Sequence, residues 1–207
     1  MKRCIDNSGT LAMLKSGTVP FFPENLDVAK LCSDVVESVA FWVHSRGITL
    51  RLNADKEINF VADRALLELL LINLLSNSLA ACSDGGSITV TLFRSGHNLV
   101  LGVTDNGCGI SPVRMSTVMD CYNNSRSLDA PDNCGMGLAI VRGIAELHKG
   151  TVIIESRESI GTSVRVMLSG EIQPSGFFKE EDQWECETPE IRLLTALSYV
   201  LPDECFI

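Results

Sequence analysis

The sequence lacks the features that mark several common classes of protein. Its eight cysteines never occur in the C-x-x-C spacing of a zinc site, and they are scattered through apolar segments, which predicts reduced thiols rather than a disulfide framework. No apolar run approaches the ~20 residues of a membrane span, and no signal peptide opens the chain. Basic residues are too few for a nucleic-acid surface, since 17 Lys and Arg stand against 26 Asp and Glu. We therefore expect a cytoplasmic globular protein that does not bind nucleic acid, whether or not its parent protein is anchored in a membrane.

The common nucleotide-binding and kinase motifs are also missing. There is no G-x-x-x-x-G-K-[ST], no G-x-G-x-x-G after a strand, and neither HRD nor DFG. These absences argue against P-loop enzymes, Rossmann-type dinucleotide-binding domains and protein kinases of the HRD/DFG type.

Acidic charge is concentrated in the last part of the chain. From Glu171 onward there are 9 acidic and 2 basic residues, so −7 of the total charge of −9 lies there. The same stretch is rich in turn-forming residues, and we expect an acidic C-terminal extension over residues 171–207. Residues 1–23 resemble the last turn of a helix followed by a Gly/Pro linker. The globular domain is expected between them, over residues 24–170.

The most distinctive feature of the sequence is a leucine-rich stretch over residues 65–81. Its leucines recur every three or four residues, which predicts a buried helix, and Asp63 stands where a helix cap is expected. Asn73 and Asn77 lie one turn apart and share a face of this helix. Buried carboxamides need hydrogen-bond partners. This face therefore either bonds to a neighbouring loop or lines a polar pocket in which Asn77 offers its oxygen to a hard cation such as Mg²⁺.

The rest of the domain alternates between helical and strand patterns. Before the leucine-rich helix, the patterns predict an extended segment near residue 26, a helix over residues 28–46 and strands over residues 48–53 and 58–63. After it, two strands joined by a turn predict a hairpin, and a further helix precedes a last strand pair. The predicted fold is a two-layer α/β sandwich, with a mixed, mostly antiparallel sheet of about five strands and three helices on one face.

Three glycine-bearing turns follow strands or open helices, at residues 105–109, 135–137 and 161–162. Gly135 and Gly137 open a helix, where free N–H groups favour an anion such as phosphate. Asp105 ends an apolar strand, and its carboxylate is an acceptor suited to an exocyclic amine. Each signal is weak alone, because a D-x-G-x-G turn is more often structural than functional.

The order of these elements resembles the ATP-binding domain of the GHKL (Bergerat-fold) ATPase superfamily. The helix with N-L-L-S-N, the hairpin, D-N-G-C-G-I, a variable loop, G-M-G-L at a helix start and G-T before the last strand follow in the order of that superfamily. Within it, the chain is most similar to the catalytic domain of two-component sensor histidine kinases, over residues 24–169.

This resemblance implies a role for each motif. Asn77 corresponds to the Mg²⁺-binding asparagine, and Asn73 to the catalytic residue that helps to position the metal-bound water or the reacting phosphate. Residues 111–134 would form the lid over ATP. The other nucleotide-binding residues that it implies are Asp105 for the adenine amino group, Gly107 and Gly109 in its turn, Gly135 and Gly137 facing the phosphates, and Thr162 near the adenine.

The resemblance also implies cofactors and partners. The domain would bind ATP and Mg²⁺ and transfer the γ-phosphate to a histidine on a dimerisation segment missing from this chain, with a response regulator as a further partner. Residues 11–26 match the end of the dimerisation helix and its linker. Because His44, His97 and His148 do not lie on such a segment, the chain alone is expected to bind ATP without autophosphorylating.

The sequence departs from the family pattern in its phosphate-binding part. Ala80 stands where a basic residue is common, Asn133 stands where a glycine is common, and the aromatic part of the lid is reduced to Met119, Cys121 and Tyr122. These departures support one alternative, a degenerate nucleotide-binding interaction module. An anti-sigma-factor serine kinase of the same fold is a second alternative.

Overall fold

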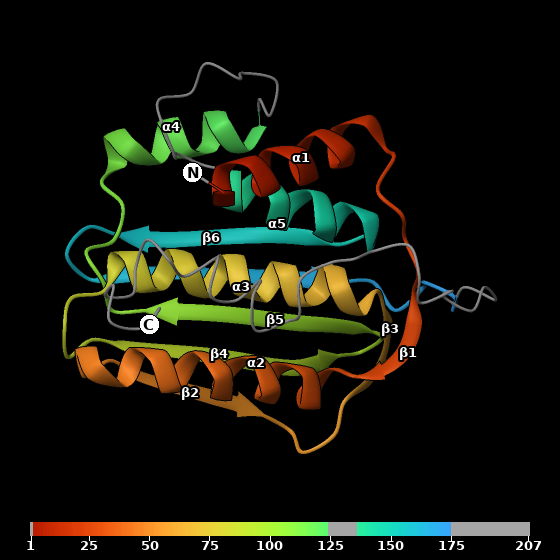
Figure 1. Ribbon diagram of the computed structural model, residues 1–207, viewed down its shortest axis with the longest axis horizontal. Coiled ribbons are helices and arrows are strands. Elements are labelled where there is room, and N and C mark those ends of the chain that lie inside the picture. The colour runs from red at the N-terminus through yellow and green to blue at the C-terminus, as the bar shows by residue number, and fades with distance from the viewer. Residues whose placement is uncertain (1, 124–135, 175–207) are drawn as a thin grey trace.

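The computed structural model describes residues 2–123 and 136–174, so the end of the predicted lid and nearly all of the acidic extension lie outside the described residues. A five-stranded sheet forms one layer of the fold (Figure 1). The strand order is β2 (Thr49–Ala54), β4 (Ser87–Ser95), β5 (Asn98–Asp105), β7 (Gly161–Leu168) and β6 (Thr151–Arg157). β2 pairs parallel with β4, and the other neighbours are antiparallel. The predicted mixed, mostly antiparallel sheet is confirmed.

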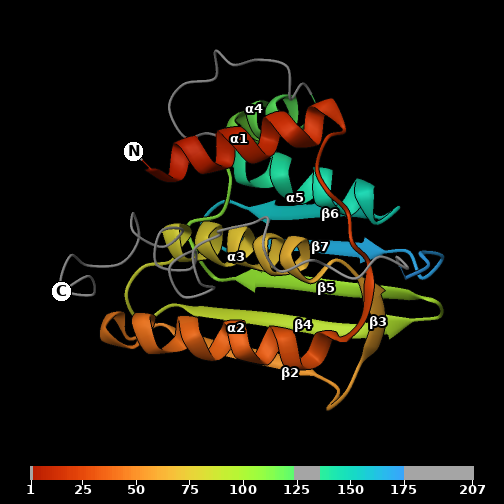
Figure 2. The ribbon, with the colours of Figure 1, turned by 45° about the vertical axis from the view of Figure 1, so that its right-hand side comes forward.

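Three helices cover one face of this sheet, as predicted. They are α2 (Val28–Val43), α3 (Arg64–Ala81) and α5 (Met136–Leu147). Figure 2 shows the three helices on the same face, with α3 between α2 and α5. Their apolar side chains and the inward-facing residues of the strands form a single hydrophobic core. Burial of apolar area is the main stabilising term in folding, so the packing of these helices on the sheet is the main source of the domain's stability.

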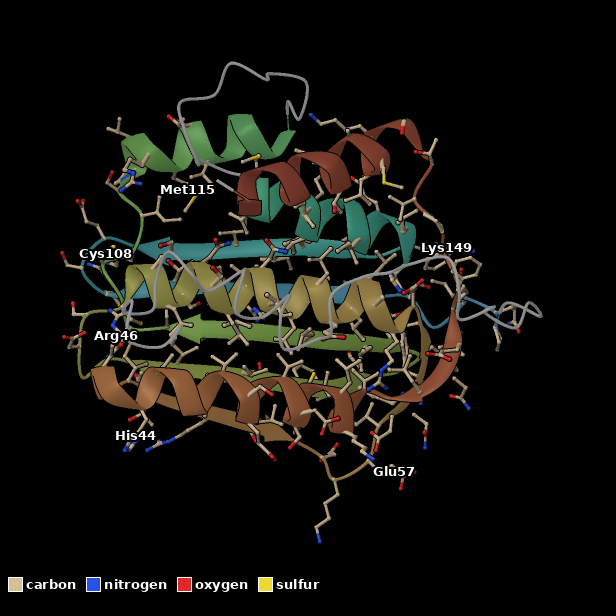
Figure 3. The ribbon with its side chains drawn as sticks, viewed as in Figure 1. His44, Arg46, Glu57, Cys108, Met115 and Lys149 are labelled. Atoms are coloured by element: carbon tan, nitrogen blue, oxygen red, sulfur yellow. The ribbon has the colours of Figure 1, made fainter. Side chains whose placement is uncertain are left out.

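Helix α3 is buried on almost every side, because the sheet lies beneath it and two helices flank it. Asp63 is its N-cap and accepts a hydrogen bond from the Leu66 N–H, as predicted. At the other end, the Arg46 guanidinium donates to the carbonyls of Leu79 and Cys82 (Figure 3). By length and composition alone, α3 is the one described helix that could cross a membrane, but 61% of it is buried within the domain. Its apolar character is therefore that of a core helix.

The helix in the N-terminal segment is longer than the sequence predicted. The prediction was a last helical turn before a linker, whereas α1 (Lys2–Ser16) is a helix of 15 residues. It packs on α5 (Figure 1), where a methyl group on Gly143 would lie only 3.1 Å from a methyl carbon of Leu14. Glycine at position 143 thus lets the two helices approach. A further helix, α4 (Pro112–Asn123), forms the first half of the predicted lid region.

A separate two-stranded sheet joins β1 (Glu24–Asp27) to β3 (Asn59–Ala62) in antiparallel register. Both extended segments were predicted, but their pairing was not. Asp27 connects this sheet to α2, since its carboxylate accepts from the N–H groups of Ile58, Ala29 and Lys30. The bond from Ile58 lowers the pKa of Asp27.

The first turn of α3 and the last turn of α5 meet in a buried cluster, called the anchor end here, formed by Phe21, Phe22, Asp63 and His148. His148 is fully buried, and its Nε2 accepts from the Asp63 N–H at 3.1 Å. Nδ1 therefore carries the proton and donates to the Ile144 carbonyl at 2.8 Å. The Asp63 carboxylate accepts from the Phe22 N–H at 2.8 Å, and the Phe21 ring meets the imidazole in a T-shaped contact at 4.9 Å. Burial lowers the pKa of His148.

Candidate functional site

Four segments that are distant in sequence meet at the opposite end of α3 and α5, called the site end here. They are the last turns of α3, the turn after β5, the start of β7 and the start of α5 (Figure 1). In Figure 3, Cys108 marks the turn after β5 and Arg46 lies near the last turn of α3. The structure thus brings the predicted asparagine pair, the first glycine turn and the threonine to one end of the molecule.

The Asp105 carboxylate is buried at this end and is held by three protein donors. Asp105 is only 7% exposed. Oδ1 accepts from the backbone N–H groups of Gly107, at 2.9 Å, and Thr162, at 3.2 Å. Oδ2 accepts from the Ser78 hydroxyl at 3.0 Å. Buried carboxylates are tolerated only with such partners, and one acceptor position on Oδ2 remains for a ligand.

Two glycines let the turn after β5 approach its neighbours. A methyl group on Gly107 would lie 2.5 Å from the Ala81 carbonyl oxygen, which accepts the Cys108 N–H at 3.0 Å. Gly109 has a φ of +64°, and a methyl group there would overlap the Arg157 carbonyl oxygen. A side chain at either position would therefore push the turn away from α3 or β6 and displace Asp105.

Thr162 lies opposite Asp105 in the ladder between β5 and β7. Its Oγ1 is 2.8 Å from Ser156 Oγ, which donates to the Gly161 carbonyl and accepts from the Ile110 N–H. Because the Ser156 hydroxyl donates its proton to the Gly161 carbonyl, the Thr162 hydroxyl is the donor in the bond between Thr162 and Ser156. Its oxygen still has a lone pair that a ligand can use.

Asn73 and Asn77 share a helix face, as predicted, but their environments differ. Asn73 is 3% exposed and its Nδ2 donates to the Leu69 carbonyl at 2.9 Å, whereas Asn77 is exposed. Both contact the start of α5, because a methyl group on Gly137 would lie 3.2 Å from Asn73 Oδ1 and 3.4 Å from both terminal atoms of Asn77. The asparagine pair and the second glycine turn are thus adjacent in space.

An exposed carboxamide at Asn77 suits Mg²⁺, which prefers oxygen ligands. Within residues 2–123 and 136–174, no group of three or more His, Cys, Asp or Glu could hold a metal ion. A Mg²⁺ ion at Asn77 would therefore take its other ligands from phosphate and water, as this ion often does. Gly135 and Asn133 lie outside the described residues, and so do the side chains of the reduced aromatic part of the lid.

A family model described as "Histidine kinase-, DNA gyrase B-, and HSP90-like ATPase" matches residues 62–172, just over half of the chain. The match includes every segment of the site end. The chain belongs to this ATPase family. Membership implies nucleotide binding, since the family binds ATP, and it agrees with the predicted superfamily.

The chain is similar in sequence to named histidine kinases. It is 28% identical to the sensor-like histidine kinase SenX3 of Mycobacterium tuberculosis over 171 residues, which are 81% of this chain and 41% of the relative. It is 37% identical to the histidine protein kinase DivJ of Caulobacter vibrioides over 113 residues, which are 54% of this chain and 19% of the relative. The chain therefore spans about two fifths, or less, of the length of these relatives.

Solved structures place the ATPase in the same fold. The histidine kinase AdeS of Acinetobacter baumannii gives a TM-score of 0.66 at 19% identity, covering 83% of this chain and 79% of that one. The nucleotide-free catalytic domain of the histidine kinase ThkA gives 0.61 at 22% identity, covering 73% of this chain and 97% of that one. At such identities the likeness concerns the fold, and it confirms the predicted Bergerat-type architecture.

Sequence reasoning missed two hydroxyl groups at the site end, those of Ser78 and Ser156. Ser78 follows Asn77 directly, and a hydroxyl in a leucine-rich helix was a signal that could have been used. Ser156 had no such signal, because strand β6 reads as ordinary strand. Near them, burial raises the pKa of the Cys82 thiol and the Asp105 charge adds to this, so Cys82 stays protonated.

Proposed function

We propose that this ATPase domain is the catalytic domain of a sensor histidine kinase, which transfers the γ-phosphate of ATP to a histidine outside this chain. The observation that carries the proposal is the convergence at the site end of a bonded carboxylate, Asp105, with the asparagine pair against Gly137. The histidine kinases among the similar proteins support this type of acceptor.

In this proposal the two halves of the site bind different parts of the nucleotide. Asp105 accepts from the 6-amino group of adenine, with Thr162 beside it. Gly137 faces the phosphates at the start of α5, where backbone N–H groups favour anions. Asn77 gives its oxygen to Mg²⁺, and Asn73 positions the reacting phosphate. Gly107, Gly109 and Gly135 complete the proposed set.

The reaction requires mainly positioning and charge stabilisation. Bound Mg²⁺ would neutralise charge on the phosphates, while the residues of α3 and α5 orient them. The buried bond from Asn73 to Leu69 fixes the carboxamide, so that its Oδ1 stays directed at Gly137.

The same proposal assigns the flanking segments. Helix α1 and the chain up to residue 23 are the end of a dimerisation helix and its linker, residues 24–170 are the catalytic domain, and residues 171–207 are an acidic extension. The acceptor histidine would come from the dimerisation segment of the parent kinase, a response regulator would receive the phosphate, and the domain would work in the cytoplasm.

Calorimetric titration of Mg²⁺–ATP and Mg²⁺–ADP into the chain tests the proposal, beside Asn77→Ala. We expect Mg²⁺ to strengthen ATP binding, and Asn77→Ala to remove most of that gain, roughly tenfold in affinity. Asn53→Ala, at an exposed asparagine on β2, is the matched control and should bind as the parent does. ADP binding that is indifferent to Mg²⁺ would contradict the assigned phosphate half, and absence of any binding would contradict the kinase assignment.

A further inference from the structure

The Asp105 carboxylate offers an uneven set of acceptor positions. A carboxylate has about four lone-pair positions, two on each oxygen. Oδ1 uses both of its positions on the N–H groups of Gly107 and Thr162. Oδ2 uses one on the Ser78 hydroxyl, so one position on Oδ2 is left by the described residues.

Ser78 is placed to hold that oxygen. It is 5% exposed and projects from α3, which is fixed in the core at its N-cap and along its leucines. Its bond to Asp105 joins residues 27 positions apart, so it links helix α3, which carries Asn77, to strand β5, which ends at Asp105. A buried hydroxyl that lost this acceptor would be costly, which keeps the Ser78 proton on Oδ2.

We propose that Ser78 is a positioning residue for base recognition: its hydroxyl fixes Oδ2 of Asp105 so that the carboxylate presents a single acceptor to the 6-amino group of adenine. The inference rests on the proposed function of Asp105. A fixed acceptor pairs with the amine of adenine but faces the carbonyl oxygen of a 6-oxopurine, which also accepts and is repelled. The Ser78 hydroxyl cannot turn to donate to that carbonyl without leaving Oδ2.

The proposal is tested by combining a change in the protein with a change in the ligand. The affinities of ATP and of purine riboside triphosphate, which lacks the 6-amino group, are measured for the parent chain and for Ser78→Ala. We expect Ser78→Ala to weaken ATP about fivefold to tenfold, and the analogue by less than about twofold. A merely structural role would weaken both ligands equally.

Two further variants separate positioning from stability. Ser78→Thr keeps the hydroxyl and should restore the preference for ATP. Ser76→Ala removes another buried hydroxyl from the same helix and should leave the ratio of the two affinities unchanged, whatever it does to the melting temperature.

The outcomes distinguish this inference from the function on which it rests. If the parent chain binds ATP no better than the analogue, then Asp105 does not recognise the amine and the proposed function of that residue fails. If the parent prefers ATP and Ser78→Ala keeps the full preference, the role of Ser78 is wrong and that of Asp105 stands. Equal weakening of both ligands would also overturn the role of Ser78.

Discussion

The two ends of the α3–α5 helix pair are built from similar groups but are arranged differently. Each end holds a buried aspartate that accepts backbone N–H bonds, Asp63 at the anchor end and Asp105 at the site end. At the anchor end the imidazole nitrogens of His148 are both bonded within the protein. Both aspartates keep acceptor positions, since each Asp63 oxygen and Oδ2 of Asp105 have one donor. The ends therefore differ in exposure: Asp63 and His148 are buried at the anchor end, whereas Asn77 is exposed at the site end.

This difference separates groups that stabilise the fold from groups that can bind a ligand. Polar groups that are buried together with their partners contribute to folding and are closed to a ligand. An exposed carboxamide, and an unfilled acceptor at the same end of the helix pair, can exchange water for a ligand. Substitutions at the anchor end should therefore change stability, and substitutions at the site end should change affinity.

The largest expected effect is that of Asp63→Ala at the anchor end. The change removes the N-cap of α3 and leaves the partly buried Phe22 N–H without its acceptor, so the free energy of unfolding should fall by about 2–4 kcal/mol. Urea unfolding measures this, with Asp55→Ala at an exposed aspartate as the control. The folded variant should bind ATP with the affinity of the parent. A large loss of affinity at unchanged stability would contradict the stabilising role of the anchor end.

Asp105→Asn should have the next largest effect, mainly on affinity. The carboxamide oxygen can keep the N–H groups of Gly107 and Thr162, but the new NH₂ group would face the ligand amine and repel it. We expect ATP to bind about 10- to 100-fold more weakly. Titration calorimetry checks this, and the melting temperature should fall modestly, because the Ser78 hydroxyl loses its carboxylate acceptor. Unchanged binding of ATP would remove Asp105 from the site; Asp55→Asn is the charge-matched control.

Gly137→Ala tests the phosphate half of the site end. The added methyl group would lie 3.2 Å from the buried Asn73 Oδ1, so the start of α5 must shift by a few tenths of an ångström. We expect Mg²⁺–ATP to bind about fivefold more weakly, while adenosine binds as before. Gly9→Ala is the matched control, since no atom lies within 4 Å of a methyl group there. Equal losses of affinity for ATP and adenosine would mean that Gly137 does not act on phosphate binding alone.

The smallest expected effect is a dependence of stability on pH at the anchor end. The folded-state pKa of His148 lies below the ordinary 6.5, so the unfolded chain takes up the proton first as pH falls. The stabilising contribution of neutral His148 is complete above about pH 6.5 and decreases below it, by at most about 1.4 kcal/mol for each pH unit, until the folded-state pKa is reached. Unfolding of the parent and of His148→Gln between pH 5 and 7 measures this. An identical slope in both chains would contradict it.

The parts of the fold that were predicted correctly are those set by local pattern. The leucine spacing of α3, its cap at Asp63 and the hairpin ending at Asp105 need no knowledge of the rest of the chain. The pairing of β1 with β3 was missed because strands of four residues show too short an alternation to indicate a partner. The length of α1 was missed because its packing on α5 is a tertiary contact, which the local pattern does not reveal.

At the site end, sequence order placed the motifs but not their contacts. Asn73 and Asn77 read alike in sequence, and only the packing of α5 makes one buried and leaves the other exposed. The bond from Ser78 to Asp105 depends on how α3 lies across β5, which no spacing along the chain reveals. Propensity and periodicity act over one or two turns, whereas these contacts depend on tertiary packing.

The strand order has a consequence for how the protein is made. β6 precedes β7 in the chain yet lies outside it, so a growing chain carries β6 before it has any strand to pair with. Only when β7 emerges and enters between β5 and β6 does Asp105 gain the Thr162 N–H. Loop closure of this kind is slow, because the entropy of the connecting chain is lost before the ladder forms. The bonded carboxylate of Asp105 is therefore completed last, and a nascent chain that stops short of β7 lacks one of its three donors.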